Sequence, residues 1–463
     1  MQVKSLLLAG GALLGGTAPA AAAGFQVYLP GQVSNGMGGV GVGLSLDQSA
    51  MYLNPGALAL VKRNGVVLGA NATFARVSFR SENGGPQRDL QSTITPPFNF
   101  YASFGPKEGK FKAGLAVYTP AGSKLVYADG WEGRAALTQI DLKSVFIQPT
   151  LSYAITPQLS VGAGLTILAL GSVNLQRDIV ALPYPGASIE LDGKTKTQFG
   201  VNAGIMFKPS EKVSIGLAYR SKVDATVEEG TVTVKGLPSA DPAGSSYGAS
   251  RRINPGFTAS QFKATLPIPA HAALGIGLMP TEKLTLGFDV VLTQWSVYRE
   301  LRFEFSGDNG NGTYAAVGPQ PAAGAPFAAG SYPATTGTPG LIGGQPASVS
   351  KRNYDDALCF RLGAQYQVSS KLAVRGGAVY DQSPVRQGYV TPETPDNDRV
   401  GLTTGFSYNA TDKFGVDVSY QFIQILKRTQ TTADLLDSGT TDRVAGTYNT
   451  YINIPGLGVH YNF

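Results

Sequence analysis

The sequence has 463 residues, of which 15% are charged, and it contains 59 glycines, 21 tyrosines, 21 phenylalanines and one cysteine. Its formal net charge of +6, with no run of Lys or Arg longer than two residues, excludes a nucleic-acid-binding protein. The lone cysteine, Cys359, excludes an internal disulfide and a thiolate metal site. The length fits two or three soluble domains or one large β-barrel. Abundant glycine and aromatic residues with few charges favour the barrel, because they are typical of many short strands.

Residues 1–23 have the pattern of a secretory signal peptide. Lys4 supplies the positive start, "SLLLAGGALLGG" is an apolar stretch of signal length, and "APAAAAG" offers small residues for cleavage after Ala23. The alternative, a transmembrane anchor, is disfavoured because the segment is short and lacks a stop-transfer flank. Beyond it, no window of about 18 residues is free of charges and turn residues. An exported chain of this kind enters a bilayer as a closed barrel, in which every backbone group is paired.

Residues 24–63 lack the alternation that marks the rest of the chain. The stretch "NGMGGVGVG" is rich in glycine, a short helical piece is predicted over residues 46–53, and Asn54, Pro55 and Gly56 follow. The glycines would let this backbone lie close to a neighbouring surface. We predict a compact, partly helical segment that is not part of a sheet.

From residue 64 onwards, apolar and polar residues alternate with a two-residue period, which predicts β-strands. Short polar turns and longer polar loops follow one another in turn, as in outer-membrane barrels. Six short turns give twelve strands, and one more strand at each end, near residues 65–80 and 447–463, gives fourteen. The short turns lie at residues 104–114, 154–162, 207–216, 278–287, 366–376 and 408–417. The long loops lie near residues 81–96, 120–138, 177–195, 230–255, 306–352, 382–397 and 429–446.

The last strand, "GLGVHYNF", keeps its alternation up to the final residue, Phe463. We predict that it closes the barrel against the first strand, and we expect the barrel-assembly machinery to recognise it. A soluble β-sandwich or propeller is the alternative. It is disfavoured because the apolar strand faces carry almost no charge, and because tyrosines stand at strand ends, where a membrane interface favours them.

The sequence therefore predicts an all-β fold, a 14-stranded antiparallel transmembrane β-barrel over residues 64–463. We expect it in the outer membrane of a Gram-negative bacterium, monomeric and in contact with lipid and lipopolysaccharide. A barrel of this size lies between those filled by side chains, at about eight strands, and those that leave an aqueous channel, at about sixteen. We expect residues 24–63, called the hatch below, to plug the lumen.

The start of the predicted mature chain, "GFQVYLPGQVSNGMGGVGVGLSLDQSAMYLNPGAL", resembles the N-terminus of FadL/TodX-type transporters of hydrophobic compounds. Members of that family begin with Gly-Phe-Gln and carry Asn-Pro-Ala in the hatch, whereas this chain has Gly56 at the third position of the motif. Further similar stretches run in the family's order along almost the whole chain. They include "GWEGR", "LPIPAHAALGIGL", "LTLGFDVVLTQWS", "RLGAQYQVSSKLAVRGGAVYDQSPV" and "TPDNDRVGLTTGFSY".

The resemblance implies a fourteen-stranded barrel with an N-terminal hatch, and a transport route. A hydrophobic molecule, such as a long-chain fatty acid or an aromatic hydrocarbon, lands on outer loops, enters a pocket beside the hatch and leaves sideways through the wall. The family's opening comes from a kink in the third strand. Here Pro120 and Gly122 are the candidates for it, because both weaken a strand; they could instead begin the outer loop.

Charged lumen-facing residues are candidates for binding a ligand carboxylate. By strand parity, these residues are Arg220, Asp289, Arg361, Arg375, Asp381 and Asp417. Arginines among them could hold a carboxylate, or could pair with aspartates and tie the hatch to the wall. The resemblance adds Arg177, which falls near the family's carboxylate-binding basic residue.

Aromatic residues are candidates for contact with the apolar part of a ligand. The resemblance places Gly24, Phe25 and Gln26 at the pocket, although Phe25 could simply pack within the hatch. Trp131 in "GWEGR" is predicted on an outer loop, as an exposed landing site or as an interfacial tryptophan.

The sequence favours passive transport of hydrophobic molecules over catalysis. The only histidines are His271 and His460, and no serine motif accompanies either, so neither an enzyme nor a bound metal or other cofactor is expected. The alternative function is a general aqueous porin or a surface adhesin built on a barrel. A porin narrows its lumen with a loop folded in from outside, rather than with an N-terminal plug.

Overall fold

The computed structural model describes residues 24–26, 28–91, 94–106, 109–180, 186–236, 259–306, 347–436 and 442–463. The predicted signal peptide lies outside these ranges. Within them, no helix has the length and apolar character needed to cross a membrane.

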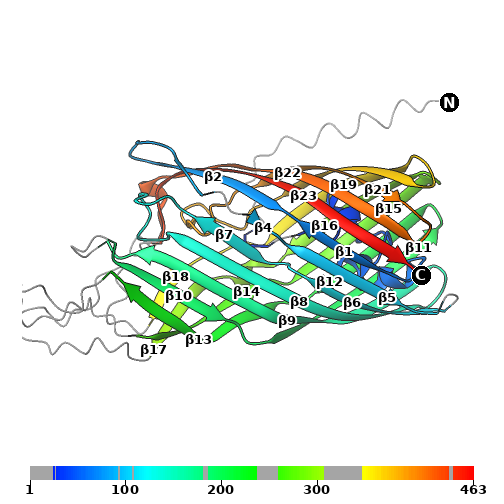
Figure 1. Ribbon diagram of the computed structural model, residues 1–463, viewed down its shortest axis with the longest axis horizontal. Coiled ribbons are helices and arrows are strands. Elements are labelled where there is room, and N and C mark those ends of the chain that lie inside the picture. Colours follow the sequence, from blue (N-terminus) through cyan, green and yellow to red (C-terminus); the bar gives the residue numbers. More distant parts are fainter. Residues whose placement is uncertain are drawn as a thin grey trace, which may run out of the picture.

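The described strands form one antiparallel sheet that closes on itself (Figure 1). The last strand, β23 (Gly446–Asn462), pairs with both β1 (Gly65–Asn71) and β2 (Thr73–Ser81). At the join, the Phe463 amide donates to the Asn64 carbonyl over 3.1 Å. The prediction that the last strand closes the wall against the first is confirmed. Several strands are segments of one interrupted wall strand, so the 23 described strands make a barrel of fourteen.

Some wall strands run without a break and others consist of two or three segments separated by short irregular stretches. The uninterrupted wall strands are the fourth, β8 (Gln139–Ala154), the fifth, β9 (Leu159–Asp178), the eleventh, β20 (Leu372–Asp381), the twelfth, β21 (Arg399–Asn409), the thirteenth, β22 (Phe414–Gln430), and the fourteenth, β23. The first three are segmented: β1 with β2; β3 (Arg88–Asp89), β4 (Ile94–Thr95) and β5 (Phe98–Phe104); and β6 (Phe111–Tyr118) with β7 (Gly122–Val126). The sixth to tenth are β10 (Ser188–Lys194) with β11 (Gln198–Ser210), β12 (Val213–Arg220) with β13 (Val223–Lys235), β14 (Gln261–Ile268) with β15 (His271–Thr281), β16 (Leu284–Thr293) with β17 (Glu300–Ser306), and β18 (Ala347–Lys351) with β19 (Ala357–Gln367). The short 3₁₀ helix η2 (Trp295–Val297) lies between the two segments of the ninth wall strand, and η3 (Thr432–Asp434) follows the thirteenth wall strand.

The wall extends further toward the long-loop end than the sequence predicted. The expected loops at residues 120–138 and 177–195 are wrong in part, because β7 and β10 lie inside them and pair with β8 and β9. The outward residues of β10 are polar or charged, and those of β7 are Gly122, Lys124 and Val126, so neither segment presents a row of apolar residues. Both segments therefore lack the apolar alternation of a lipid-facing strand, although backbone pairing continues.

The outer face of the barrel carries an apolar band with a sharp upper edge. On β8, the outward positions from Tyr153 to Val145 are apolar, and Lys143 and Asp141 follow. Those nine residues rise about 20 Å along the barrel axis, from about 3.3 Å per residue and a tilt of about 40°. The height approaches the band of about 25 Å that outer-membrane barrels present to lipid. Exposed side chains of the band include Leu68, Leu115, Leu151, Leu165, Phe199, Val201, Leu217, Leu274, Phe288, Leu362, Leu402, Phe406 and Leu457.

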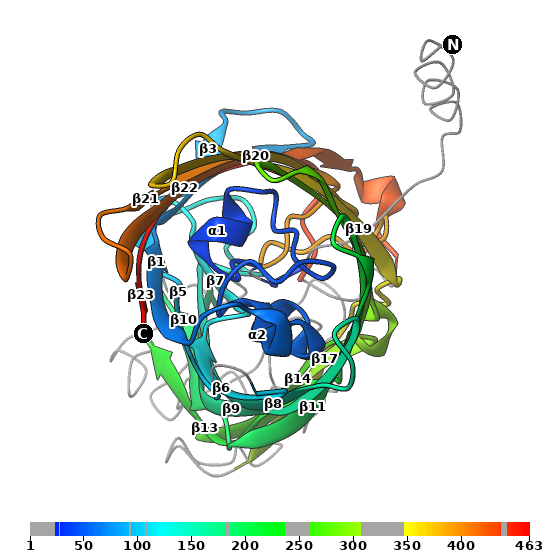
Figure 2. The same cartoon turned by 90° about the vertical axis from the view of Figure 1, so that its right-hand side faces the viewer.

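The hatch lies inside the ring of strands, where its helices α1 (Gln32–Asn35), α2 (Ala50–Leu53) and the 3₁₀ helix η1 (Pro55–Leu60) are enclosed by the wall (Figure 2). Wall glycines allow this close fit. A Cβ added at Gly216 would overlap the Val42 carbonyl, and one at Gly363 would overlap the Met37 carbonyl.

The Asn54-Pro55-Gly56 motif fastens η1 to the wall. The Asn54 amide nitrogen donates to the carbonyls of Val42 (2.8 Å) and Ile205 (3.0 Å), and its oxygen accepts from the Gly56 amide (2.9 Å). Pro55 occupies the first turn, where its missing N–H has no cost. A Cβ at Gly56 would lie 2.7 Å from the Gly204 carbonyl oxygen. This contact is a physical reason for glycine at the position where the family has alanine.

Candidate functional site

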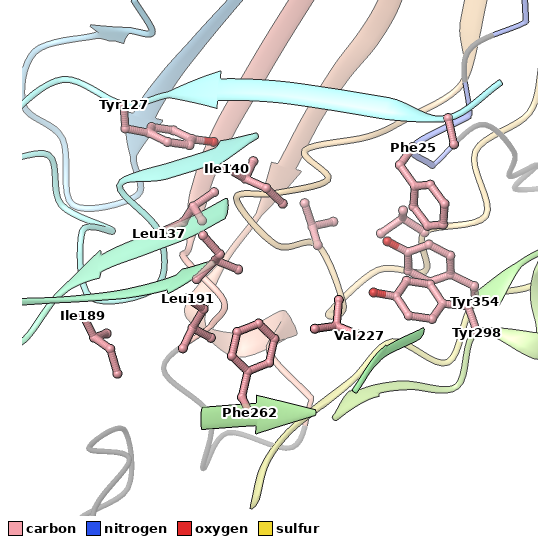
Figure 3. Close-up of a cluster of buried hydrophobic side chains, with 14 of the residues drawn as sticks. Phe25, Tyr127, Leu137, Ile140, Ile189, Leu191, Val227, Phe262, Tyr298 and Tyr354 are labelled. Carbon is pink, nitrogen blue, oxygen red and sulfur yellow. The ribbon is translucent and has the colours of Figure 1, made fainter. Parts of the chain in front are cut away.

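A cavity of about 500 Å³ lies between the hatch and the outer half of the barrel. Most of its lining is apolar. The cavity adjoins a cluster of buried aromatic and aliphatic side chains that reach inward from many strands (Figure 3). In that view Phe25 of the hatch points toward Tyr298 and Tyr354 of the wall, and its ring lies 6.0 Å from that of Tyr298.

The first described residues of the hatch pair with the wall at this cavity. The Gly122 amide donates to the Phe25 carbonyl (3.2 Å), and Gln26 forms an isolated β-bridge with Ala121. The Phe25 ring also meets the edge of Trp295 at 5.0 Å. Gly24, Phe25 and Gln26 all line the cavity, together with Pro120 and Gly122. The structure thus brings together five residues that the sequence singled out separately.

A carboxylate from the segment between β20 and β21 holds the other side of Gly24. Asp396 accepts from the Gly24 amide (3.1 Å) and from the Ser383 hydroxyl (2.7 Å). Arg399 pairs with Asp396 (3.0 Å) and donates to the Gly24 carbonyl (3.1 Å). Residues 391–396 are in turn bound by Arg352, which donates to Thr391 over 2.7 Å. The sequence reasoning missed Asp396 and Arg399, whose contact with Gly24 spans more than 370 residues of chain.

Asp396→Asn is expected to loosen the hatch start. The NH₂ group of asparagine replaces one carboxylate oxygen and cannot accept a hydrogen bond, so the side chain loses its bond to Gly24 or its bond to Arg399, and it loses its charge. Charge-assisted hydrogen bonds each contribute about 1.5–3 kcal/mol. We expect amide exchange in residues 119–126, which include the two residues that pair with the hatch start, Ala121 and Gly122, to accelerate at least tenfold by hydrogen-exchange mass spectrometry. Asp434→Asn is the control, because the Asp434 carboxylate caps η3 and makes no hydrogen bond to Gly24 or Arg399 in the described residues. Unchanged exchange in Asp396→Asn would show that Asp396 does not hold Gly24.

Backbone pairing between the second and third wall strands is interrupted among the described residues, and we call this break the window. Residues 96–98 bound it on one side and residues 119–122 on the other. Among the described residues, backbone pairing of the two strands stops at Asn99 and Tyr118, and the next backbone bond joins the Gln91 amide to the Val126 carbonyl over 2.9 Å. Between them, the Thr119 side chain accepts from the Phe98 amide over 3.2 Å and donates to the Phe98 carbonyl over 3.4 Å. The break at Pro120 therefore lies within the wall, because β7 resumes the same wall strand beyond it.

The cavity reaches the window. Strand β8 borders the cavity there with consecutive residues, among them Ser144 and Phe146, which face the lumen, and Lys143 and Val145, which face outward. The cavity lining therefore continues up to the break between the second and third wall strands.

Two arginines, buried Arg361 and partly buried Arg220, lie at the hatch side of the cavity. The Arg361 guanidinium lies 3.4 Å from the centre of the Tyr28 ring, and its Nη1 atom has no hydrogen-bond partner in the described residues. Burial raises the pKa of Tyr28 well above its ordinary value, so this ring is a neutral partner for the cation. Arg220 donates to the Tyr52 carbonyl (2.9 Å) and to Gln148 (3.0 Å). Both arginines and His271 line the cavity.

The other predicted lumen charges have different places: Asp381 also lines the cavity, Asp289 binds the hatch, and Arg375 and Arg177 lie outside the cavity lining. Asp289 accepts from the amides of Gly41 (2.7 Å) and Val42 (3.0 Å). Arg375 lies outside the cavity lining, and donates to Gln365 and Ser407, each over 2.7 Å. Arg177 also lies outside the lining. The structural role that the sequence left open, tying wall to hatch, therefore applies to Asp289.

Trp131 is buried, so the expectation of an exposed landing site is wrong. Its indole stacks on Tyr127 with 3.9 Å between ring centroids, and its Nε1 donates to the Leu137 carbonyl over 2.7 Å. The chain turns back here, since the Tyr127 amide bonds the Thr138 carbonyl. This local turn directs the side chain into the interior cluster.

The histidines do not form a nucleophile–base pair within the described residues. His460 Nδ1 lies 2.6 Å from Asp417, whose other oxygen accepts from Ser407. The Ser407 hydroxyl therefore meets the carboxylate instead of the imidazole, the reverse of what an activated serine needs. No grouping of His, Cys, Asp and Glu in the described ranges could hold a metal ion.

Comparison with known proteins shows what this chain resembles. Residues 13–463 match the family model of outer membrane protein transport proteins (OMPP1/FadL/TodX). Outer membrane protein P1 of Haemophilus influenzae is 23% identical over 389 residues, which cover 77% of this chain and 73% of that protein. The crystal structure of a Pseudomonas aeruginosa FadL homologue superposes with a TM-score of 0.73 at 20% identity, covering 95% of this chain and all of that one. The toluene transporter TbuX of Ralstonia pickettii gives 0.60 at 17% identity, over 94% and 98% of the two chains.

Proposed function

Because the chain belongs to the OMPP1/FadL/TodX family of outer membrane transport proteins, we propose that it carries hydrophobic small molecules across the outer membrane without an energy source. The observation that supports this most is the mostly apolar cavity beside the hatch, whose lining reaches the window. We further propose that residues 1–23 are removed, that residues 24–63 plug the lumen, and that the protein works as a monomer assembled through its Phe463 strand.

The proposed route runs from capture near the outer loops to the cavity and then sideways through the window into the membrane. Apolar surface alone supports binding, at about 2.5 kcal/mol for each 100 Å² removed from water. A modest affinity is sufficient, because a tightly held molecule would not leave. Lateral exit keeps the cargo out of water at every step, and the closely fitted hatch leaves the axial path closed.

The two arginines at the cavity, buried Arg361 and partly buried Arg220, favour a carboxylate-bearing cargo, such as a long-chain fatty acid. A buried guanidinium without a full set of partners is costly, and a carboxylate in the cavity would satisfy it with paired hydrogen bonds. Arg361, with its unpartnered Nη1, is the first candidate and Arg220 the second. The second candidate cargo is a neutral aromatic hydrocarbon, which the apolar lining also favours. Toluene is the cargo named for the TbuX relative.

Replacing Arg361 distinguishes these two cargo classes. In Arg361→Met, we expect binding of palmitate to weaken 10- to 100-fold, since a charged hydrogen bond contributes about 1.5–3 kcal/mol. Binding of toluene should stay within twofold. Equilibrium dialysis with radiolabelled ligands and detergent-solubilised protein measures both affinities.

Arg375→Met is the matched control, because it removes a buried lumen arginine that does not line the cavity. It should leave palmitate binding within twofold. Equal palmitate affinity in Arg361→Met and the parent would reject the carboxylate assignment and leave the neutral hydrocarbon.

A further inference from the structure

Two lysines stand on the outer face beside the window, where both border the cavity, and the transport route proposed above gives them no role. Lys124 on β7 lies opposite Asp141 on β8 in the register, and Lys143 lies opposite Gly122, the residue that follows the break. Both lysines contact the same Asp141 carboxylate oxygen, at 3.4 and 3.0 Å. One carboxylate therefore holds the two ammonium groups side by side at the opening.

These lysines mark the upper edge of the apolar band. Below Lys143, the outward positions of β8 are apolar down to Tyr153. The same change occurs on the sixth wall strand, where exposed Val201 and Phe199 give way to Lys194. Because the long loops face outward from the cell in such barrels, this edge is the level of the outer-leaflet headgroups.

We propose that Lys124 and Lys143 bind a phosphate of a lipopolysaccharide molecule at its lipid A headgroup. The outer membrane location of the family supplies this partner, and lysine ammonium groups suit phosphate as point charges. The Lys143 side chain is 67% exposed, so it can reach a headgroup while it contacts Asp141.

The surface beneath the lysines fits the acyl chains of the same molecule. Phe98 borders the window, and Leu115 lies on the adjacent strand. Both side chains are exposed on the outer face, Phe98 by 37% and Leu115 by 41%. A lipid anchored by its phosphate would lay its chains over this surface, next to the opening. The idea that this lipid also receives the emerging cargo rests on the proposed function, whereas the binding of the lipid to the two lysines does not.

The test measures binding of hexa-acylated, bis-phosphorylated lipid A to the detergent-purified full chain by native mass spectrometry. The parent should retain the lipid, and the double variant Lys124→Gln/Lys143→Gln should bind it at least fivefold more weakly. Lipid A stripped of its phosphates should bind the parent as weakly as it binds the double variant. Lys235→Gln is the matched control, because Lys235 is an exposed lysine of the outer wall paired with Glu190, away from the window.

Three results would overturn the proposal. The double variant could bind lipid A as tightly as the parent, Lys235→Gln could lose as much affinity as the double variant, or inorganic phosphate could displace lipid A at equal concentration. The last would make the lysines a site for free phosphate. None of these results depends on cargo binding, which the Arg361→Met comparison tests separately.

Discussion

Deleting residues 24–63 is expected to convert a closed barrel into an open pore. The hatch fills the lumen at the level of α1, α2 and η1, and wall glycines bring it into direct backbone contact with the strands. A fourteen-stranded barrel without it would be intermediate between filled barrels and those with aqueous channels. In planar lipid bilayers, we expect the parent to show no resolvable steps and the deletion variant to show stable single-channel currents.

A point substitution tests the same claim in the full-length chain. Gly216→Val should displace the hatch and produce smaller or intermittent currents, because a Cβ at Gly216 would overlap the Val42 carbonyl. Gly376→Val is the control, since the nearest atom to a Cβ at Gly376 is 3.9 Å away. A folded deletion variant without currents would contradict the plug. A parent that conducts as well as the deletion variant would favour the aqueous porin instead.

The barrel could be predicted because its information is local and repeated. Each short turn lies between two alternating strands, so counting turns counted strands, and the resulting fourteen is confirmed. Parity placed the lumen-facing charges for the same reason: a strand's facing repeats every two residues. Asp289, Arg361 and Arg375 are indeed buried inside the barrel. The alternation also predicted that the terminal strand ending at Phe463 closes the wall.

The site could be predicted only in part, because its contacts join distant segments. The hydrogen bond between the Gly24 amide and Asp396 joins residues 372 positions apart, so neither local sequence contains a pattern that predicts it. Trp131 was expected on the surface because it lies in a polar, glycine-containing stretch, whereas a turn directs it inward. Strands β7 and β10 were predicted as loops because their outward positions do not form a row of apolar residues, so the two-residue alternation of a lipid-facing strand is missing. The sequence predicts whether a strand residue faces the lumen or the lipid. Which side chains share one cavity depends on the strand register and on where the hatch lies.

A short deletion should close the window while the residues of β6 and β7, the two segments of the third wall strand, keep their inward and outward orientations. Tyr118 ends β6 facing the lumen, and Gly122 begins β7 facing outward, so deleting residues 119–121 restores continuous alternation. The same operation is possible at residues 195–197, between β10 and β11, where Lys194 faces outward and Gln198 inward. That break lies outside the cavity lining. The two deletions are therefore matched in length and in their effect on the wall.

Uptake of radiolabelled palmitate and toluene by cells that express each deletion variant tests the central claim most directly. The account predicts that the 119–121 deletion reduces uptake of the transported compound at least tenfold, to the level of cells without the protein. The 195–197 deletion should retain at least half of the parent rate. Parental uptake by a folded 119–121 variant would contradict exit through the window between the second and third wall strands.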